Sequence, residues 1–263
     1  MKIHIGTFVA LVLFLGTPLS FAGSELERAR QMLQQLERDR SEAGKTHRQF
    51  TADEIEQRLI RIQRVVNQGI LSLLNQTSPP ARGQLEKSLW RMQGIPEGST
   101  GPGLASVLSN ETSGRRVFVV AYTLVGAIAM SRSWIGVFGS DESGGPFEVL
   151  ASADNTLPNK TVAVELLGTP RRKGLVLLAY GVNWGDAHNR LTVIAYSFSG
   201  RRLEPIWSRA DLPQGEVKTE DDKIKLTFLS SPLGPGHKSV HSVTQIYRHT
   251  PAGIRLESMH PVD

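Results

Sequence analysis

The sequence predicts an α+β fold, in which a helical N-terminal region precedes an antiparallel, hairpin-rich β-domain built as a meander or a sandwich. Three observations support this fold class. Apolar residues recur at three- and four-residue steps between residues 24 and 93. Between residues 104 and 263, short apolar segments alternate with turns that contain glycine, proline or aspartate. The stretch from 94 to 103 is rich in Gly, Pro, Ser and Thr, which is typical of a linker.

The first 22 residues have the layout of a cleavable secretory signal peptide. Lys2 supplies a positive start, and an unbroken apolar run follows from Phe8 to Leu15. Pro18 ends any helix, and Ser20-Phe21-Ala22 places small residues at both ends of a cleavage triplet. The apolar run has eight residues, far fewer than the ~20 that a transmembrane helix needs. We therefore expect cleavage after Ala22, no transmembrane segment in the mature chain, and a periplasmic or secreted location.

The 263-residue chain contains no cysteine. This excludes disulfides, thiolate metal sites and cysteine nucleophiles. Extracellular animal domains usually carry disulfides, so an exported chain without them fits the bacterial envelope or exterior better. A chain of this length can form a core without covalent cross-links.

Three amphipathic helices are predicted in region 24–93. Ser24 and Glu27 have the spacing of a capping box at the start of the first, as do Thr51 and Glu54 at the start of the second. The third should begin near Pro79-Pro80, because proline suits a first helical turn. The expected buried positions are Leu26, Ala29, Leu33 and Leu36, then Ile55, Leu59, Ile62, Val66, Ile70 and Leu73, then Leu85, Leu89 and Met92. Each stripe is one-sided, so the helices must pack on one another or on the β-domain.

Ten strands are predicted in the β-domain, and three turns between them have clear hairpin chemistry. The turns are Ser199-Gly200, Glu220-Asp221-Asp222 and Thr250-Pro251-Ala252-Gly253. The strands are Val117–Val125, Trp134–Phe138, Phe147–Ala151, Val162–Leu167, Leu175–Val182, Leu191–Phe198, Leu203–Trp207, Lys223–Leu229, Val240–Tyr247 and Ile254–Glu257.

Three segments share a loose plan of aromatic strand, glycine-bearing turn and second strand. Their aromatics Phe138, Tyr196 and Tyr247 lie 58 and 51 residues apart. This spacing resembles that of propeller blades, but any antiparallel sheet made of hairpins has a similar pattern. Because the β-domain holds about three such units and a ring needs at least four blades, a complete propeller is not expected.

The formal net charge is +5, but the basic residues are not clustered as they are in a nucleic-acid-binding surface. Opposite charges are interspersed, and the longest basic run is Arg171-Arg172-Lys173. No nucleic-acid partner is therefore expected. Arg58, Arg61 and Arg64 form a basic ridge on the second helix. This ridge is either the solvated face of the helix or a weak contact for an anionic membrane surface.

The common catalytic and cofactor motifs are absent. The chain has no G-x-S-x-G elbow, S-x-x-K or H-E-x-x-H motif, phosphate loop, dinucleotide fingerprint or calcium loop. We therefore predict no cofactor. His237 and His241 are four residues apart, but a strand would separate them by ~13 Å, too far to share a metal ion. The acidic segment from Asp141 to Gly145 lacks calcium-ligand spacing and is typical of a turn.

One loop stands out as a candidate ligand-binding site. It carries Trp184, Asp186, His188 and Arg190 between two predicted strands. An indole can stack on a sugar or peptide while the carboxylate and imidazole form hydrogen bonds. Asp186 and His188 also suit an acid/base pair. The competing interpretation is a structural turn, since the neighbouring asparagines and glycine are turn formers.

Together these features predict a non-catalytic binding or interaction module of the bacterial envelope or exterior. Its partner would be an unidentified envelope or extracellular ligand or protein. The alternative is a hydrolase of envelope polysaccharide or peptide that uses a carboxylate or a His/Asp pair.

Overall fold

The structure, a computed structural model, describes residues 21–45, 50–76, 79–95, 104–112, 115–127, 130–140, 145–157, 162–168, 175–183, 189–230 and 241–262. In these ranges three helices precede twelve strands. The helices are α1 (Phe21–Lys45), α2 (Ala52–Leu74) and α3 (Arg82–Met92). The protein is thus mainly β with helices at its N-terminal side, consistent with the predicted α+β class.

The described strands form three four-stranded antiparallel sheets, and each sheet is a meander of consecutive strands. The first sheet contains β1 (Ala105–Thr112), β2 (Arg115–Ala127), β3 (Met130–Gly139) and β4 (Glu148–Asp154). The second contains β5 (Ala163–Leu167), β6 (Leu175–Asn183), β7 (Arg190–Phe198) and β8 (Leu203–Pro213). The third contains β9 (Glu216–Glu220), β10 (Lys223–Ser230), β11 (His241–Thr250) and β12 (Gly253–Val262). None of these sheets closes on itself.

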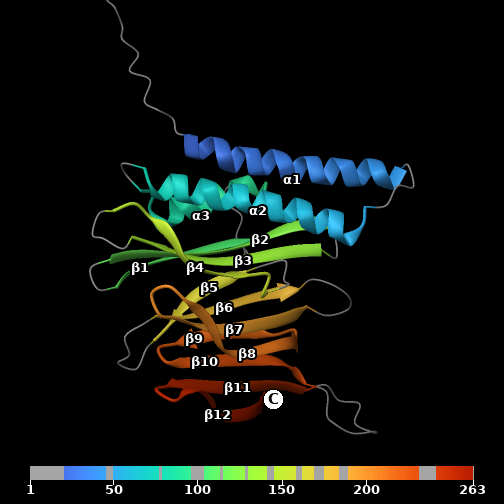
Figure 1. The fold of residues 1–263 in the computed structure, drawn as a ribbon. Helices are drawn as coiled ribbons and strands as arrows, with labels where there is room; N and C mark the ends of the chain where they lie inside the picture. The colour runs from blue at the N-terminus through green and yellow to red at the C-terminus, as the bar shows by residue number, and fades with distance from the viewer. Residues whose placement is uncertain are drawn as a thin grey trace, which may run out of the picture.

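The helices and the three sheets form successive layers, with the helices at one end (Figure 1). A separate apolar core fills each interface between layers. Neighbouring residues of one strand point to opposite faces. On β2, Phe118 packs against the helices and Val119 against the second sheet. On β6, Leu177 packs against the first sheet and Leu178 against the third. Burial on both faces explains why these strands are almost continuously apolar.

The helix starts show one success and one error of the sequence prediction. Thr51 forms the predicted capping box, because its side chain accepts from the Glu54 amide at 3.2 Å and Glu54 accepts from the Thr51 amide at 2.9 Å. The prediction for Ser24 is wrong, because α1 already begins at Phe21 and places Ser24 inside the helix. In α3, the Gln84 side chain accepts from the Ala81 amide, so this helix begins just after the predicted prolines.

The predicted apolar stripes are buried with small exceptions. On α2 the last buried residue is Leu74, whereas Leu73 is half-buried. Leu33 on α1 is also half-buried. The glycine just after α3, Gly94, has φ 77°, and its amide donates to the carbonyl of Arg91 at 3.0 Å, which ends the helix.

A polar network connects α2 to the first sheet. The guanidinium of Arg132 on β3 donates to Gln63 Oε1 at 2.6 Å and to Glu56 Oε1 at 3.0 Å. It also pairs with Asp154 on β4. The Arg132 side chain is only 11% exposed. One arginine therefore orients the helix on two neighbouring strands.

All ten predicted strands are present, with bounds shifted by a few residues, and two more strands accompany them. The added strands are β1 and β9. The three predicted hairpin turns join β7 to β8, β9 to β10 and β11 to β12. Phe138, Tyr196 and Tyr247 each lie on the third strand of their sheet. The loose sequence repeat thus corresponds to three equivalent meanders stacked in an open series.

Candidate functional site

The predicted loop site lies largely outside the described residues. Trp184, Asp186 and His188 belong to the undescribed stretch, so their role stays a prediction. Arg190 is the first residue of β7, exposed, and paired across the sheet with Asn183 and Pro213.

The histidines do not gather into a metal site in the part that the structure describes. His237 lies outside it, and His241 is the first residue of β11. Buried His249 places Nδ1 3.0 Å from the carbonyl oxygen of Gly168. Among the described residues, no group of three or more potential ligands surrounds a common point. Of the acidic turn from Asp141, only Gly145 is described.

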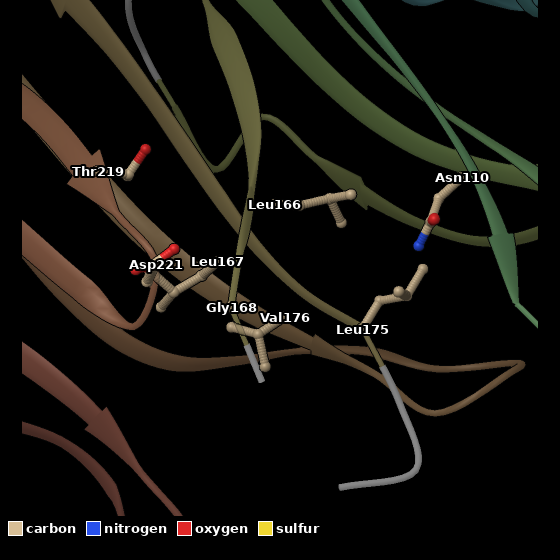
Figure 2. Close-up of a pocket in the computed structure, with 8 residues that line it drawn as sticks. All are labelled: Asn110, Leu166, Leu167, Gly168, Leu175, Val176, Thr219 and Asp221. Carbon is tan, nitrogen blue, oxygen red and sulfur yellow. The ribbon is translucent and has the colours of Figure 1, made fainter. Parts of the chain in front are cut away.

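The described residues form a pocket of about 400 Å³ where the first strands of the three sheets meet. In Figure 2 the side chains of Leu166, Leu175 and Asn110 point toward one another on one side of β5. Thr219 and Asp221 lie on the other side of this strand. We call this the inter-sheet pocket. The residues that line it are Asn110 from β1, Leu166, Leu167 and Gly168 at the end of β5, Leu175 and Val176 at the start of β6, and Thr219 and Asp221 at the end of β9.

A close backbone approach between the second and third sheets builds one wall of the pocket. The amide of Gly168 donates to the carbonyl oxygen of Asp221 at 2.7 Å. A Cβ at Gly168 would lie 2.7 Å from that oxygen, so only glycine permits this contact. Asp221 has φ 49° in the β9–β10 turn, a left-handed conformation that aspartate tolerates better than most residues. The turn chemistry in the sequence therefore also places a carboxylate at the pocket.

A half-buried carboxylate connects the two sheets beside the pocket. Glu165 on β5 faces the third sheet, and its Oε1 accepts from the hydroxyl of Tyr180 on β6 at 2.6 Å. Its Oε2 accepts from the hydroxyl of Thr219 on β9 at 2.5 Å. Burial, followed by the hydrogen bond to Glu165, raises the pKa of Tyr180 well above its usual range. Tyr180 is therefore a neutral donor at physiological pH and not a nucleophile.

The sequence reasoning missed the groups at the pocket. Glu165 is the only charged residue in the predicted strand 162–167, and an isolated carboxylate in an apolar strand is a signal that could have identified it. Asn110 and Thr219 lie on the two strands that were not predicted. Asp221 was predicted only as a turn residue.

The basic ridge of α2 is partly engaged within the protein. Arg58 Nη1 lies 2.5 Å from Asp39 Oδ2 on α1, and its guanidinium stands 4.8 Å from the centroid of the Phe50 ring. The hydrogen bond from Arg58 holds the pKa of Asp39 below its usual range. Arg61 and Arg64 are exposed. The predicted membrane contact would therefore depend mainly on these two residues.

None of the described helices is long and apolar enough to cross a bilayer.

No protein family and no curated protein matches the sequence. One matching solved structure is the GH93 alpha-L-arabinofuranosidase of Fusarium graminearum in complex with arabinobiose. The TM-score is 0.32 at 13% sequence identity, and the match covers 64% of this chain and 53% of that chain. The chain thus spans about half the length of that structure. Because so low a score identifies neither fold nor activity, we infer function from the chain's own residues.

Proposed function

We propose that the chain is an exported, non-catalytic binding protein of the bacterial envelope or exterior, with its ligand site in the inter-sheet pocket. The pocket itself carries the proposal, since it has a volume of about 400 Å³ and combines an apolar wall with polar groups from different strands. Ligand sites are typically concave, ~300–1,000 Å³ in volume, and lined by apolar side chains with a few placed polar groups.

An exposed apolar side chain at the pocket supports this assignment. Leu166 is 37% exposed although it lies on a strand between two packed sheets. Its neighbours Leu167 and Val164 are buried in the two inter-sheet cores. A ligand in the pocket would cover Leu166 and so gain the free energy of burying its apolar surface.

A pair of matched substitutions tests the pocket as the ligand site. Leu166→Arg introduces a charge into the pocket, whereas Ile206→Arg introduces the same charge on β8, the opposite edge of the second sheet. The two side chains are similarly exposed, 37% and 42%. We expect the immobilised mature chain to capture a ligand from envelope extracts of its source. Leu166→Arg should reduce the amount captured about tenfold, which corresponds to ~1.4 kcal/mol, and Ile206→Arg should not. Equal capture by both variants and the unchanged chain would refute this site.

Export is supported by the signal-peptide layout and by the position of α1. Cleavage after Ala22 would remove only two residues of α1, and Leu26, which is buried in the helical core, would remain. Cleavage would also leave Ser24 near a new helix start, where serine is a favourable cap. We expect mass spectrometry of the chain from a bacterial host to show Gly23 as its first residue. Ala22→Phe should block this cleavage. Chain that retains Met1 and fractionates with cytosolic markers would contradict export.

The alternative of a hydrolase is favoured by one observation, the presence of the carboxylates Glu165 and Asp221 around one pocket. Both Glu165 oxygens already accept hydrogen bonds, which suits a structural role better than acid/base catalysis. Asp186 and His188 stay candidates for this chemistry. The test is to incubate the chain with envelope polysaccharide or peptide and to measure new reducing ends or amino termini. Hydrolysis that is lost in Asp221→Asn or Asp186→Asn would replace the binding proposal with an enzymatic one.

A further inference from the structure

We infer that the inter-sheet pocket binds a short extended peptide, which pairs through its backbone with Leu166 on the free edge of β5. This ligand class rests on the proposed function, because it assumes that the pocket is a ligand site. Three features lead to it: the direction of the backbone groups of β5, the short length over which its edge is open, and the difference between the two sides of the strand.

One edge of β5 has no neighbouring strand in its sheet. The order of the second sheet is β5-β6-β7-β8, so within the described residues β5 pairs only with β6. The amide of Val164 donates to Ser106 Oγ on β1 at 3.4 Å. The amide of Gly168 donates to the carbonyl oxygen of Asp221 at 2.7 Å. Both amides therefore point away from β6, toward the free edge.

The backbone groups of Leu166, halfway between these two residues, point the same way. In an antiparallel pair, every second residue directs both its N–H and its C=O toward the neighbouring strand, and the residues between direct theirs away from it. The pairing of β5 with β6 shows no register shift from Ala163 to Leu167, so the alternation is not interrupted. The N–H and C=O of Leu166 are thus on the free edge, where the described part of the chain provides no backbone partner for them. Because Leu166 lines the pocket, a ligand can reach both groups.

The open part of this edge is short. Ser106 occupies the edge at Val164, and the Asp221 carbonyl occupies it at Gly168. Between them, one ligand residue in extended conformation can accept from the N–H of Leu166 and donate to its C=O, as a hydrogen-bonded pair of an antiparallel ladder does. Addition of a strand to a sheet edge is a common mode of peptide recognition. Since the edge is closed on both sides, the paired segment is limited to about three residues.

The two sides of β5 differ, and this predicts the central side chain of the peptide. Leu166, Leu175 and the nitrogen-bearing end of Asn110 meet on one side of the strand (Figure 2). Thr219 and Asp221 lie on the other side. Side chains of directly opposite residues share one face of a sheet. The ligand residue opposite Leu166 therefore faces the leucines, and we expect it to be apolar, because it would cover a Leu166 side chain that is 37% exposed.

A blocked tripeptide tests this pairing without altering the protein. We would add acetyl-Ala-Leu-Ala-amide to the 15N-labelled mature chain and follow hydrogen exchange of the backbone amides by NMR. In the free chain the amide of Leu166 should exchange faster than those of Glu165 and Leu167, which point toward β6. The peptide should slow exchange at Leu166 and leave its two neighbours nearly unchanged. The same peptide with glutamate at its centre should bind more weakly, because its carboxylate would face apolar side chains.

An ester bond placed at either of two positions supplies the matched control. Replacing the N–H of the central leucine by an ester oxygen removes the donor to the Leu166 carbonyl, so binding should weaken about tenfold. The same replacement at the following alanine removes an N–H that points away from β5, so binding should change little. Both esters keep the side chains and differ only in which side of the peptide has lost its donor.

The outcomes separate this inference from the proposed function. If the leucine peptide leaves exchange at Leu166 unchanged, or if the two esters bind equally, the peptide inference is wrong. The pocket would still be the ligand site if Leu166→Arg reduces capture of the native ligand and Ile206→Arg does not. Equal capture by these two variants and the unchanged chain would instead refute the proposed function itself.

Discussion

Removal of the Arg132 side-chain charge is the most direct test of how α2 is held on the first sheet. In Arg132→Met the unbranched aliphatic part of the side chain is preserved, but the guanidinium that contacts Gln63, Glu56 and Asp154 is lost. The two carboxylates are 50% and 44% exposed and can return to water. Gln63 as a residue is only 9% exposed, so its side-chain amide cannot be fully hydrated.

These exposures set the size of the effect. A buried acceptor that loses its partner costs about 1–3 kcal/mol. Each half-exposed ion pair adds about 0.5 kcal/mol, as expected for pairs near the surface. We therefore expect Arg132→Met to lower the free energy of unfolding by about 2–4 kcal/mol. This is a large part of the roughly 5–15 kcal/mol that stabilises an ordinary domain.

Urea unfolding followed by circular dichroism measures this change. The matched control is Arg202→Met, because Arg202 pairs with Glu204 at 3.7 Å with side chains 79% and 64% exposed. This control should lose less than about 0.5 kcal/mol. Arg132→Lys should give an intermediate value, since lysine keeps the charge but lacks the planar fork. A loss below about 1 kcal/mol for Arg132→Met, or a loss equal to that of the control, would show that the network does not hold the helix.

Three further predictions concern stability. Gly136→Ala should cost about 3 kcal/mol or more, because a Cβ there would lie 1.8 Å from the Trp134 ring. Gly83→Ala on α3, whose Cβ would meet nothing within 4 Å, should be neutral or stabilising by up to about 1 kcal/mol. Urea unfolding of both variants compares them, and equal effects would contradict the packing around Gly136. Thr51→Ala should lose about 1 kcal/mol in the same assay, and Thr51→Ser almost nothing, because the cap needs only a hydroxyl. Equal losses in the two Thr51 variants would show that the capping box does not stabilise α2. Burial raises the pKa of every tyrosine of the chain, namely Tyr122, Tyr180, Tyr196 and Tyr247. The unfolded chain therefore releases these protons near pH ~10 before the folded chain does, so stability is unaffected below that pH and falls above it. Tyrosinate absorbance should appear together with loss of the β-sheet circular dichroism signal. Titration near pH ~10 with the signal intact would contradict the buried hydroxyls.

Local sequence patterns predicted the elements that have strong local causes. The capping box at Thr51 and the apolar stripe of α2 need only a cap and a helical period. The turn at Glu220-Asp221-Asp222 needs only residues that tolerate turn conformations. The errors arose where local causes are weak. The strand β9 has the sequence EVKTE and a single strongly apolar residue, Val217, so it exists because β10 pairs with it.

The candidate site, too, could not be predicted from local sequence patterns. The sequence directed attention to Trp184 and its neighbours, because they combine chemically capable groups in one short segment. The inter-sheet pocket instead gathers groups from β1, β5, β6 and β9, and its polar residues Asn110 and Thr219 are 109 positions apart in the sequence. Nothing in the neighbourhood of either residue indicates the other.

The sequence by itself determined the helices, most strands and the hairpins, because periodicity and turn chemistry act over a few residues. The order in which the sheets stack, and hence the pairing of Glu165 with Thr219 across two of them, was decided only by the tertiary structure. Such contacts depend on which apolar faces bury one another. Those faces are chemically alike, so their composition alone does not specify their partners.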